Sequence, residues 1–363
     1  MSLVDIRRQL RAAISRVGWL DETVRQLRNT DQFVALNERL RRLELRLAPD
    51  AETRTEAATG TVPLDGPASL VNVAVSRSVA PFLTFFPPGH FYSPVPDLAD
   101  VHAQAERLFA PRKTLPAIDL HENQQVSLFR TLASLAQDAN LPRKPSGKAR
   151  YSSDNDFYGI GDALMLVAML RYLRPRHYLE VGSGFTTALA LDVNETFLDG
   201  SLSIVAIEPY PETLTSLLRP DDDIEILAQP VQSVPLHYFE SLEANDILFI
   251  DSSHILRAGS DVHFLITTVL SLLAEGVHVH FHDIFWPFEY PRQWIEQGRA
   301  WNEDYLLHAF LMYNSAFEIV MWNGWMAANR AHVIAQELPA MLENSGGALW
   351  LRRNQRATSQ QQR

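Results

Sequence analysis

Short apolar segments recur along the second half of this 363-residue chain, and helix-length stretches separate most of them. Strands that alternate with helices build right-handed βαβ units and a mainly parallel sheet with helices on both faces. A helix is predicted over 160–173, just before the first strand. The seven predicted strands are His177–Val181, Ile204–Glu208, Ile224–Leu227, Ile247–Asp251, Val277–Asp283, Phe317–Trp322 and Ala348–Leu351. The pattern predicts a doubly wound, Rossmann-like α/β fold with a seven-stranded, mainly parallel sheet.

The first 48 residues have a different rhythm, in which apolar side chains follow one another at alternating intervals of four and three. This a/d seam predicts a helical, coiled-coil-like extension. It fits a helical hairpin, a short coil that joins copies of the chain into a homo-oligomer, or one amphipathic helix docked on its own domain. The seam positions are Ile6, Leu10, Ala13, Val17, Leu20, Val24 and Leu27, and after a phase break Leu36, Leu40, Leu43 and Leu47.

Composition and breaker residues divide the rest of the chain. Helical patterns occur at 99–109 and 121–138, after a stretch rich in proline and aromatic residues. The predicted organisation is a helical segment at 1–48, a linker at 49–68, an accessory or cap region at 69–150, the Rossmann-like domain at 151–353 and a disordered tail at 354–363.

Overall composition excludes several classes of function. The net charge of −11 argues against a nucleic-acid partner, because phosphate contacts need clustered Lys and Arg. The absence of cysteine excludes disulfides, thiolate zinc sites and cysteine nucleophiles. No window approaches 18 uninterrupted apolar residues, and the N-terminus lacks the pattern of a secretory signal. We therefore expect a cytoplasmic protein without a membrane span.

The most informative local pattern is the turn that follows the first predicted strand. The sequence Tyr178-Leu-Glu-Val-Gly-Ser-Gly-Phe-Thr-Thr runs from an apolar strand through a Gly-x-Gly turn into a helix. Glycines let the backbone turn sharply and approach a ligand, and a helix N-terminus offers free N–H groups. Because tight turns need glycine without any ligand as well, Gly182 and Gly184 alone are weak evidence of a binding site.

The second predicted strand strengthens the case for a nucleoside site. Glu208 stands at its carboxyl end, 24 positions after Gly184, where a carboxylate can accept both ribose hydroxyls. A dinucleotide site would normally carry a third glycine, and that position is Thr187. The pattern therefore favours S-adenosylmethionine over NAD. The predicted cofactor-binding residues are Glu180, Gly182, Ser183, Gly184, Glu208 and Asp251.

Further polar residues follow the fourth and fifth predicted strands. Asp251 and His254 follow one strand, and His282 and Asp283 end the next. Ligands in open α/β sheets bind beyond the carboxyl ends of the strands, so we expect these side chains to converge. Asp251 and Asp283, with His282 as a third ligand, are candidates for a Mg²⁺ site, and His254 is a candidate general base. The alternative for each Asp is a helix cap.

Three alternating histidines on the fifth predicted strand invite a comparison with transition-metal sites. His278, His280 and His282 point to one face of a strand because side chains alternate with a period of two. His278 and His280 lie well inside the sheet, where helices cover it. We therefore expect these two to be core residues, and only His282 to reach the rim.

Taken together, these residues resemble the class I S-adenosylmethionine-dependent methyltransferases, and among them the bacterial methyltransferase domain 24 family. The motifs that carry the resemblance are Phe157-Tyr-Gly-Ile-Gly-Asp162, Tyr178-Leu-Glu-Val-Gly-Ser-Gly-Phe-Thr-Thr, Ile207-Glu208-Pro, Leu248-Phe-Ile-Asp-Ser-Ser-His254 and His280-Phe-His-Asp-Ile-Phe-Trp-Pro-Phe-Glu-Tyr-Pro291.

The resemblance implies a last strand inserted antiparallel, a methionine moiety bracketed by Gly182 and Gly184, and a ribose bound by Glu208. Some metal-dependent relatives carry an Asp at the positions of Asp251 and Asp283, and some carry a His base at the position of His254. They usually follow the second Asp with another Asp or Asn, whereas this chain has Ile284. The resemblance therefore leaves the metal open.

The leading hypothesis is O-methylation of a small molecule or saccharide hydroxyl, with Asp251, His254 and Asp283 at the reacting group. The alternatives are a metal-independent N- or O-methyltransferase, and a non-catalytic Rossmann scaffold in a biosynthetic assembly. Several aromatic residues follow Asp283, and of these we expect Trp286 to face a ligand.

Overall fold

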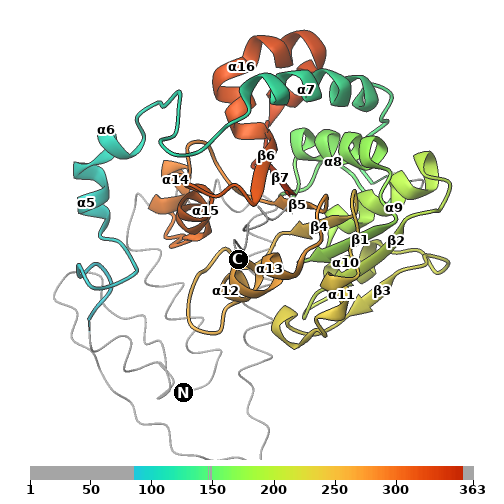
Figure 1. The fold of residues 1–363 in the computed structure, drawn as a ribbon, viewed down its shortest axis with the longest axis horizontal. Helices are drawn as coiled ribbons and strands as arrows, with labels where there is room; N and C mark the ends of the chain where they lie inside the picture. The colour runs from blue at the N-terminus through green and yellow to red at the C-terminus, as the bar shows by residue number, and fades with distance from the viewer. Residues whose placement is uncertain (1–85, 146, 148, 355–363) are drawn as a thin grey trace, which may run out of the picture. The chain divides into compact units, whose positions relative to one another are not determined.

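Seven strands form one sheet in the computed structural model, in the order β3-β2-β1-β4-β5-β7-β6 (Figure 1). Strands β1 to β5 pair in parallel, whereas β7 lies antiparallel between β5 and β6. This order confirms the doubly wound, Rossmann-like fold and the antiparallel last strand. The strands are β1 His177–Val181, β2 Ser203–Ile207, β3 Glu225–Leu227, β4 Ile247–Ile250, β5 His278–Phe281, β6 Phe317–Trp322 and β7 Leu349–Arg353.

The structure describes residues 86–145, 147 and 149–354. The predicted helical segment at 1–48, the linker at 49–68 and nearly all of the predicted tail lie outside these residues. Of the predicted cap region at 69–150, the described part begins at Phe86. Within the described residues, no helix is long and apolar enough to cross a membrane.

Helices cover both faces of the sheet, with α7 and α8 on one side and α11 and α12 on the other (Figure 1). Shorter turns of 3₁₀-helix lie at Val231–Ser233 and Pro339–Glu343, and a π-helical turn at Leu265–Val269 continues α12. The helices are α5 Leu98–Ala103, α6 Ala105–Leu108, α7 Glu122–Ala136, α8 Ile160–Leu173, α9 Phe185–Phe197, α10 Glu212–Leu217, α11 His237–Glu240, α12 Asp261–Phe264, α13 Leu270–Leu272, α14 Arg292–Glu296, α15 Glu303–Leu311 and α16 Asn323–Glu337.

Helix α8 matches the predicted 160–173 and is buried on nearly every side. A helix that is apolar all round needs partners all round, and α7 supplies the outer one. Its buried side chains Phe129, Leu132, Ala133 and Ala136 form one stripe and belong to the same core as α8. Helix α7 therefore shares its core with the Rossmann-like domain, although it precedes residue 151.

Strand register places the predicted site residues on one edge of the sheet. Val181 of β1 pairs with Ile207 of β2 and with Ile250 of β4, and Ile250 pairs with Phe281 of β5. The residues that follow each of these four therefore emerge side by side at the carboxyl edge. They are Gly182, Glu208, Asp251 and His282.

A second, smaller apolar cluster attaches the described part of the cap region to the segment after β5. Val101 of α5 packs with Tyr290 and Ile295, and partly buried aromatic rings surround them. His102 Nε2 also lies 3.0 Å from Glu296 Oε1 on α14. Within the helical pattern predicted at 99–109, the structure has two short helices, α5 and α6, that meet at Gln104.

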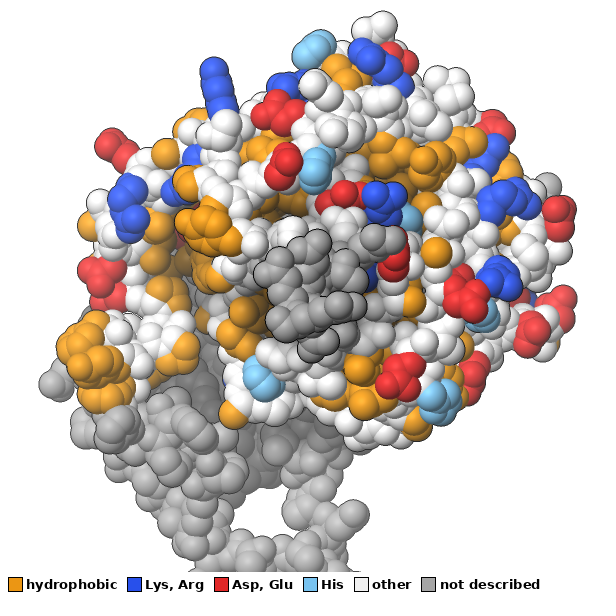
Figure 2. Space-filling view, in the orientation of Figure 1, with side chains coloured by type: hydrophobic (Ala, Val, Ile, Leu, Met, Phe, Trp, Pro, Cys, Tyr) orange, Lys and Arg blue, Asp and Glu red, His pale blue; other side chains and the backbone are white. Residues whose placement is uncertain are grey.

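Charged side chains of both signs are interspersed on the face shown in Figure 2. Lys and Arg side chains alternate there with Asp and Glu, and apolar side chains are visible between them. This face therefore presents no extended surface of a single charge.

Candidate active site

The glycine turn after β1 is wedged between the ends of two neighbouring strands. Gly182 N donates to Ile207 O at 3.0 Å, and Asp251 N donates to Val181 O at 2.9 Å. Gly182 has φ of +82°, and a Cβ atom there would lie 1.7 Å from the carbonyl oxygen of Asp251. Only glycine fits a left-handed conformation at so close an approach. The turn therefore needs Gly182 for its own geometry.

Glu180 lies beneath this turn. Its side chain is fully buried and accepts hydrogen bonds from the hydroxyls of Thr186 and Thr187, the latter at 2.5 Å. Burial raises the pKa of Glu180 to about 8. The side chain lines neither of the two cavities at the turn. Glu180 thus joins β1 to the first turn of α9, beneath the glycine turn.

Two cavities open on either side of Glu208. The larger, of about 410 Å³, reaches from the turn to residues after β3 and β4, including Gln232 and Ser252. The smaller, of about 210 Å³, contains Ser183, Gly184 and the aromatic ring of Phe157. Gly182, Glu208 and Asp251 line both. Cofactor sites typically occupy about 300–1,000 Å³, so the cavities together offer room for an extended nucleoside.

Glu208 is held by the turn itself. Its Oε2 accepts from Ser183 N at 3.2 Å and its Oε1 from Tyr210 N at 2.8 Å. Burial raises the pKa of Glu208 despite these two backbone hydrogen bonds. A carboxylate fixed between two cavities can accept hydrogen bonds from vicinal hydroxyls, as the sequence predicts for a ribose.

His254 lies among three carboxylates. Its Nε2 is 3.4 Å from Asp251 Oδ1 and 3.9 Å from Asp283 Oδ2, and its Nδ1 is 2.9 Å from Glu303 Oε2. Its side chain is only 5% exposed. His254 and Asp283 both have positive φ, of 59° and 56°, a conformation that non-glycine residues adopt rarely. The predicted catalytic residues Asp251, His254 and Asp283 therefore do come together.

Electrostatics favour the charged form of this imidazole. Burial by itself would lower the pKa of His254, but contacts with Asp251 and Glu303 raise it well above the ordinary value. Burial by itself would raise the pKa of Asp251, but the nearby His282 and His254 lower it below its ordinary value. For Asp283 burial prevails and the pKa is raised. The imidazolium thus balances part of the negative charge at the rim.

The residues predicted to bind Mg²⁺ do not fit a metal ion in this arrangement. Among the residues that the structure describes, no group of three or more His, Asp or Glu side chains can hold one. His254 Nε2 faces both Asp251 and Asp283, where a cation would have to lie. His282 Nε2 also lies close to this pair, 3.6 Å from Asp283 Oδ1. The positive charge next to these carboxylates comes from histidine.

The three histidines of β5 divide as the sequence predicts. His278 and His280 are buried in the sheet, and burial lowers the pKa of both, that of His278 to about 4. His280 stacks on Phe249 with ring centroids 3.9 Å apart. His282 lies at the rim, where Asp251 and Asp283 overcome burial and raise its pKa. His278 and His280 are core residues.

The aromatic ring next to the candidate base is Trp301, not Trp286. Trp301 lies 4.4 Å from the His254 ring. Trp286 donates its Nε1–H to Arg112 O at 3.1 Å and packs edge-on against Trp322. It therefore joins the cap segment to the core, and its contact with a ligand stays a prediction.

The sequence pattern did not indicate Glu303, and it indicated Trp301 only as one of several aromatic residues after Asp283. Asn302-Glu303-Asp304 is an ordinary helix start, where acidic residues are common. No spacing relates these residues to His254, because the contact spans 49 positions.

Comparisons with known proteins identify a family for part of this chain. A family model described as "Methyltransferase domain" matches residues 179–284. An uncharacterized protein of Archaeoglobus fulgidus is 36% identical over 167 residues, which are 45% of this chain and 76% of that protein.

Two solved structures are similar at low identity. The methyltransferase PaMTH1 of Podospora anserina, bound to S-adenosylhomocysteine, is 13% identical with a TM-score of 0.37; the match covers 71% of this chain and 95% of that one. The O-methyltransferase TomG of Streptomyces achromogenes, bound to S-adenosylmethionine, is 12% identical with a TM-score of 0.33. That match covers 71% of this chain and 97% of TomG.

The family model spans the glycine turn, Glu208, Asp251 and His254, which the sheet brings to one edge. The antiparallel β7 between β5 and β6 is the strand order expected of the same family. The chain therefore belongs to the class I S-adenosylmethionine-dependent methyltransferases.

Proposed function

We propose that this methyltransferase methylates a hydroxyl oxygen of a small molecule or saccharide, with His254 as the general base and without a metal ion. The observation that carries the proposal is the position of His254. Its Nε2 lies 3.4 Å from Asp251 Oδ1, and Asp251 lines both cavities at the glycine turn. A hydroxyl that reaches Asp251 can therefore meet both the base and the cofactor.

The residues of the turn would hold the cofactor. Glu208 would accept the ribose hydroxyls, Gly182 and Gly184 would let the backbone approach the methionine moiety, and the N-terminus of α9 would add free N–H groups. Ser183 Oγ is buried and has no hydrogen-bond partner in the part of the chain that is described. Such a group is well placed to bind a polar atom of a ligand.

Bound S-adenosylmethionine would supply a methyl group on a positively charged sulfur. The acceptor oxygen forms a bond to the methyl carbon as the carbon–sulfur bond breaks, and the electron pair of that bond remains on sulfur. His254 Nε2 takes the hydroxyl proton, and Asp251 stabilises the imidazolium that results. The products are a methyl ether, S-adenosylhomocysteine and a proton on His254.

The described part of the cap region would complete the acceptor pocket. Helix α5 packs through Val101 on the cluster that includes Tyr290 and Trp301, and Trp301 contacts His254. Aromatic rings with polar edges suit the faces and hydroxyls of a sugar. This arrangement supports a cyclic, hydroxyl-bearing acceptor rather than a macromolecule.

Transfer of a labelled methyl group from S-adenosylmethionine to a panel of sugars and phenols tests the function. We expect a methyl ether as product, full activity in excess EDTA, and no gain on addition of Mg²⁺. The variant His254→Gln should lose transfer but keep S-adenosylhomocysteine binding in calorimetry, whereas His237→Gln, an exposed histidine on α11, should retain both.

Each part of the proposal has its own contradicting result. Loss of activity in EDTA that Mg²⁺ restores would contradict the metal-independent reaction. An N-methyl product would contradict the hydroxyl acceptor. Absence of S-adenosylhomocysteine binding to the purified wild-type protein would favour a scaffold.

A further inference from the structure

Glu303 is a buried carboxylate that the cofactor site does not require. It is the first residue of α15 and only 1% exposed. Its Oε2 lies 2.9 Å from His254 Nδ1, on the opposite side of the ring from Asp251. Burial of a carboxylate is costly unless a charged or hydrogen-bonding partner compensates it. The partner here is His254.

The backbone at the start of α15 also forms hydrogen bonds with His254. Asn302 N and Glu303 N approach His254 O at 3.1 and 3.3 Å, and both N–H groups donate to it. The side chain of Asn302 accepts from Leu256 N at 2.6 Å and donates to Leu256 O at 3.3 Å. Hydrogen bonds at His254 and at Leu256 therefore connect the chain after β4 to the start of α15. They stabilise the segment in which His254 has a positive φ.

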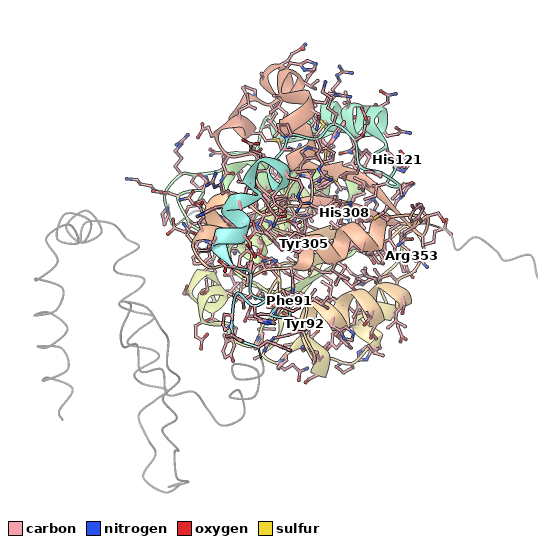
Figure 3. All side chains as sticks on the ribbon, turned by 90° about the vertical axis from the view of Figure 1, so that its left-hand side faces the viewer. Phe91, Tyr92, His121, Tyr305, His308 and Arg353 are labelled. Carbon is pink, nitrogen blue, oxygen red and sulfur yellow. The ribbon has the colours of Figure 1, made fainter. Side chains whose placement is uncertain are left out.

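Further along α15, Leu307 and Leu311 pack into the core and Tyr305 is exposed, so none of these side chains contributes to the contact with His254. Tyr305 and His308 lie on α15 where Figure 3 labels them. The Tyr305 hydroxyl donates to Glu289 Oε1 at 2.6 Å, and His308 stacks on Phe288. Only the first turn of α15 reaches His254, so the function of Glu303 can be tested apart from the rest of the helix.

We propose that Glu303 is a positioning residue that fixes the His254 ring and its tautomer for catalysis. Both ring nitrogens face carboxylates, which can only accept, but Nδ1 lies 2.9 Å from Glu303 Oε2 whereas Nε2 lies 3.4 Å from Asp251 Oδ1. The shorter contact favours the proton on Nδ1 in neutral His254 and leaves the lone pair on Nε2. That nitrogen is the one that removes the acceptor proton in the proposed function, on which this inference rests. In serine proteases, an amide in place of the orienting carboxylate lowers turnover by about 10⁴-fold because the wrong tautomer forms.

The substitution Glu303→Gln separates hydrogen bonding from size. A glutamine fits the same space, but its NH₂ group can donate to Nδ1 and favour the Nε2–H tautomer. Long-range proton–nitrogen NMR of the histidine rings, at alkaline pH where they are neutral, reports which nitrogen of His254 carries the proton. We expect Nδ1–H in the wild type and a shift to Nε2–H in Glu303→Gln, with methyl transfer at least about 100-fold slower.

Two further variants make the result specific. Glu303→Asp keeps a carboxylate and should keep Nδ1–H, with a smaller loss of rate than Glu303→Gln. Glu240→Gln, an exposed glutamate of α11 that lines neither cavity at the turn, should change neither tautomer nor rate. Binding of S-adenosylhomocysteine should stay within about threefold in all of them, because Glu303 lines neither cavity at the turn.

The inference is overturned if His254 in Glu303→Gln keeps its proton on Nδ1, or if the Asp and Gln variants lose the same rate. The first result means that another contact sets the tautomer, and the second that Glu303 only fills space. If the wild type binds no S-adenosylhomocysteine, the proposed function fails, while the NMR comparison still reports on Glu303.

Discussion

Replacement of Gly182 by alanine tests how the cofactor site depends on the contact between β1 and β4. The new Cβ would lie 1.7 Å from Asp251 O, whereas ordinary contacts begin at 3.4 Å, so the two strand ends must separate by about 1.7 Å. The left-handed φ of +82° costs an L-residue roughly 1–2 kcal/mol, and forced packing typically costs ~1–3 kcal/mol. We take about 3 kcal/mol as the total.

This cost is divided between folding and binding. Where the free protein opens the turn, binding must restore it, so the affinity for S-adenosylhomocysteine should fall by up to about 100-fold in calorimetry. The part of the cost that stays in the free protein should lower the thermal unfolding midpoint, at ~2–4 °C per kcal/mol for a domain of this size, so the two losses together correspond to about 3 kcal/mol. The matched control is Gly200→Ala, which has φ of +72° but nothing within 4 Å of its Cβ.

Gly200→Ala therefore carries the conformational cost without the collision. It should lose roughly 1–2 kcal/mol of stability and no affinity. If Gly182→Ala binds S-adenosylhomocysteine as tightly as the wild type, or if Gly200→Ala loses as much affinity, the collision with Asp251 does not govern the site.

Three further predictions concern ionisable groups. The variant Glu208→Ala loses the acceptor for Ser183 N and Tyr210 N. Because hydrogen bonds to charged groups contribute ~1.5–3 kcal/mol, S-adenosylhomocysteine binding should weaken roughly 10–100-fold in calorimetry. An unchanged affinity would exclude Glu208 from the cofactor site. Burial raises the pKa of folded Glu180 from 4.5 to about 8, so the folded state binds this proton more tightly than the unfolded chain. The free energy of unfolding should therefore fall by about 5 kcal/mol as pH rises through this interval. Urea titrations of Glu180→Gln should show no such decline. A parallel decline in the variant would show that Glu180 is not the group responsible. Methyl transfer should accelerate as pH rises above neutral, because contacts with carboxylates raise the pKa of His254 and the imidazolium must lose its proton to act as a base; a rate that falls with rising pH would contradict the general base.

Apolar patterns in the sequence predicted helices and strands well where the element has an apolar face that packs into the core. Helix α8 matches the predicted 160–173, and the seven strands fall where apolar runs were expected. The helical pattern predicted at 99–109 corresponds to two short helices, α5 and α6. Val101 is the buried residue of these two helices, so packing against the core does little to fix their ends.

The candidate site was predictable as far as strand ends determine it. Because parallel strands end at a common edge, the sequence positions of Glu208, Asp251 and His282 were enough to expect them near one another. Glu180 belongs to the same pattern, yet the structure places it beneath the turn, in contact with Thr186 and Thr187. The pattern indicates an acidic residue, but not which way its side chain points relative to the helix that covers it.

The sequence by itself determined the strand–turn–helix unit around Gly182 and the order of strands and helices, because both depend on residues that are neighbours in the chain. Only the tertiary structure decided what surrounds His254. Glu303 and Trp301 approach it from the segment that begins α15, far along the chain, and the chain carries no local signal for a contact that exists only after packing. The same packing directs His254 between Asp251 and Asp283, where the sequence pattern suggested a metal ion.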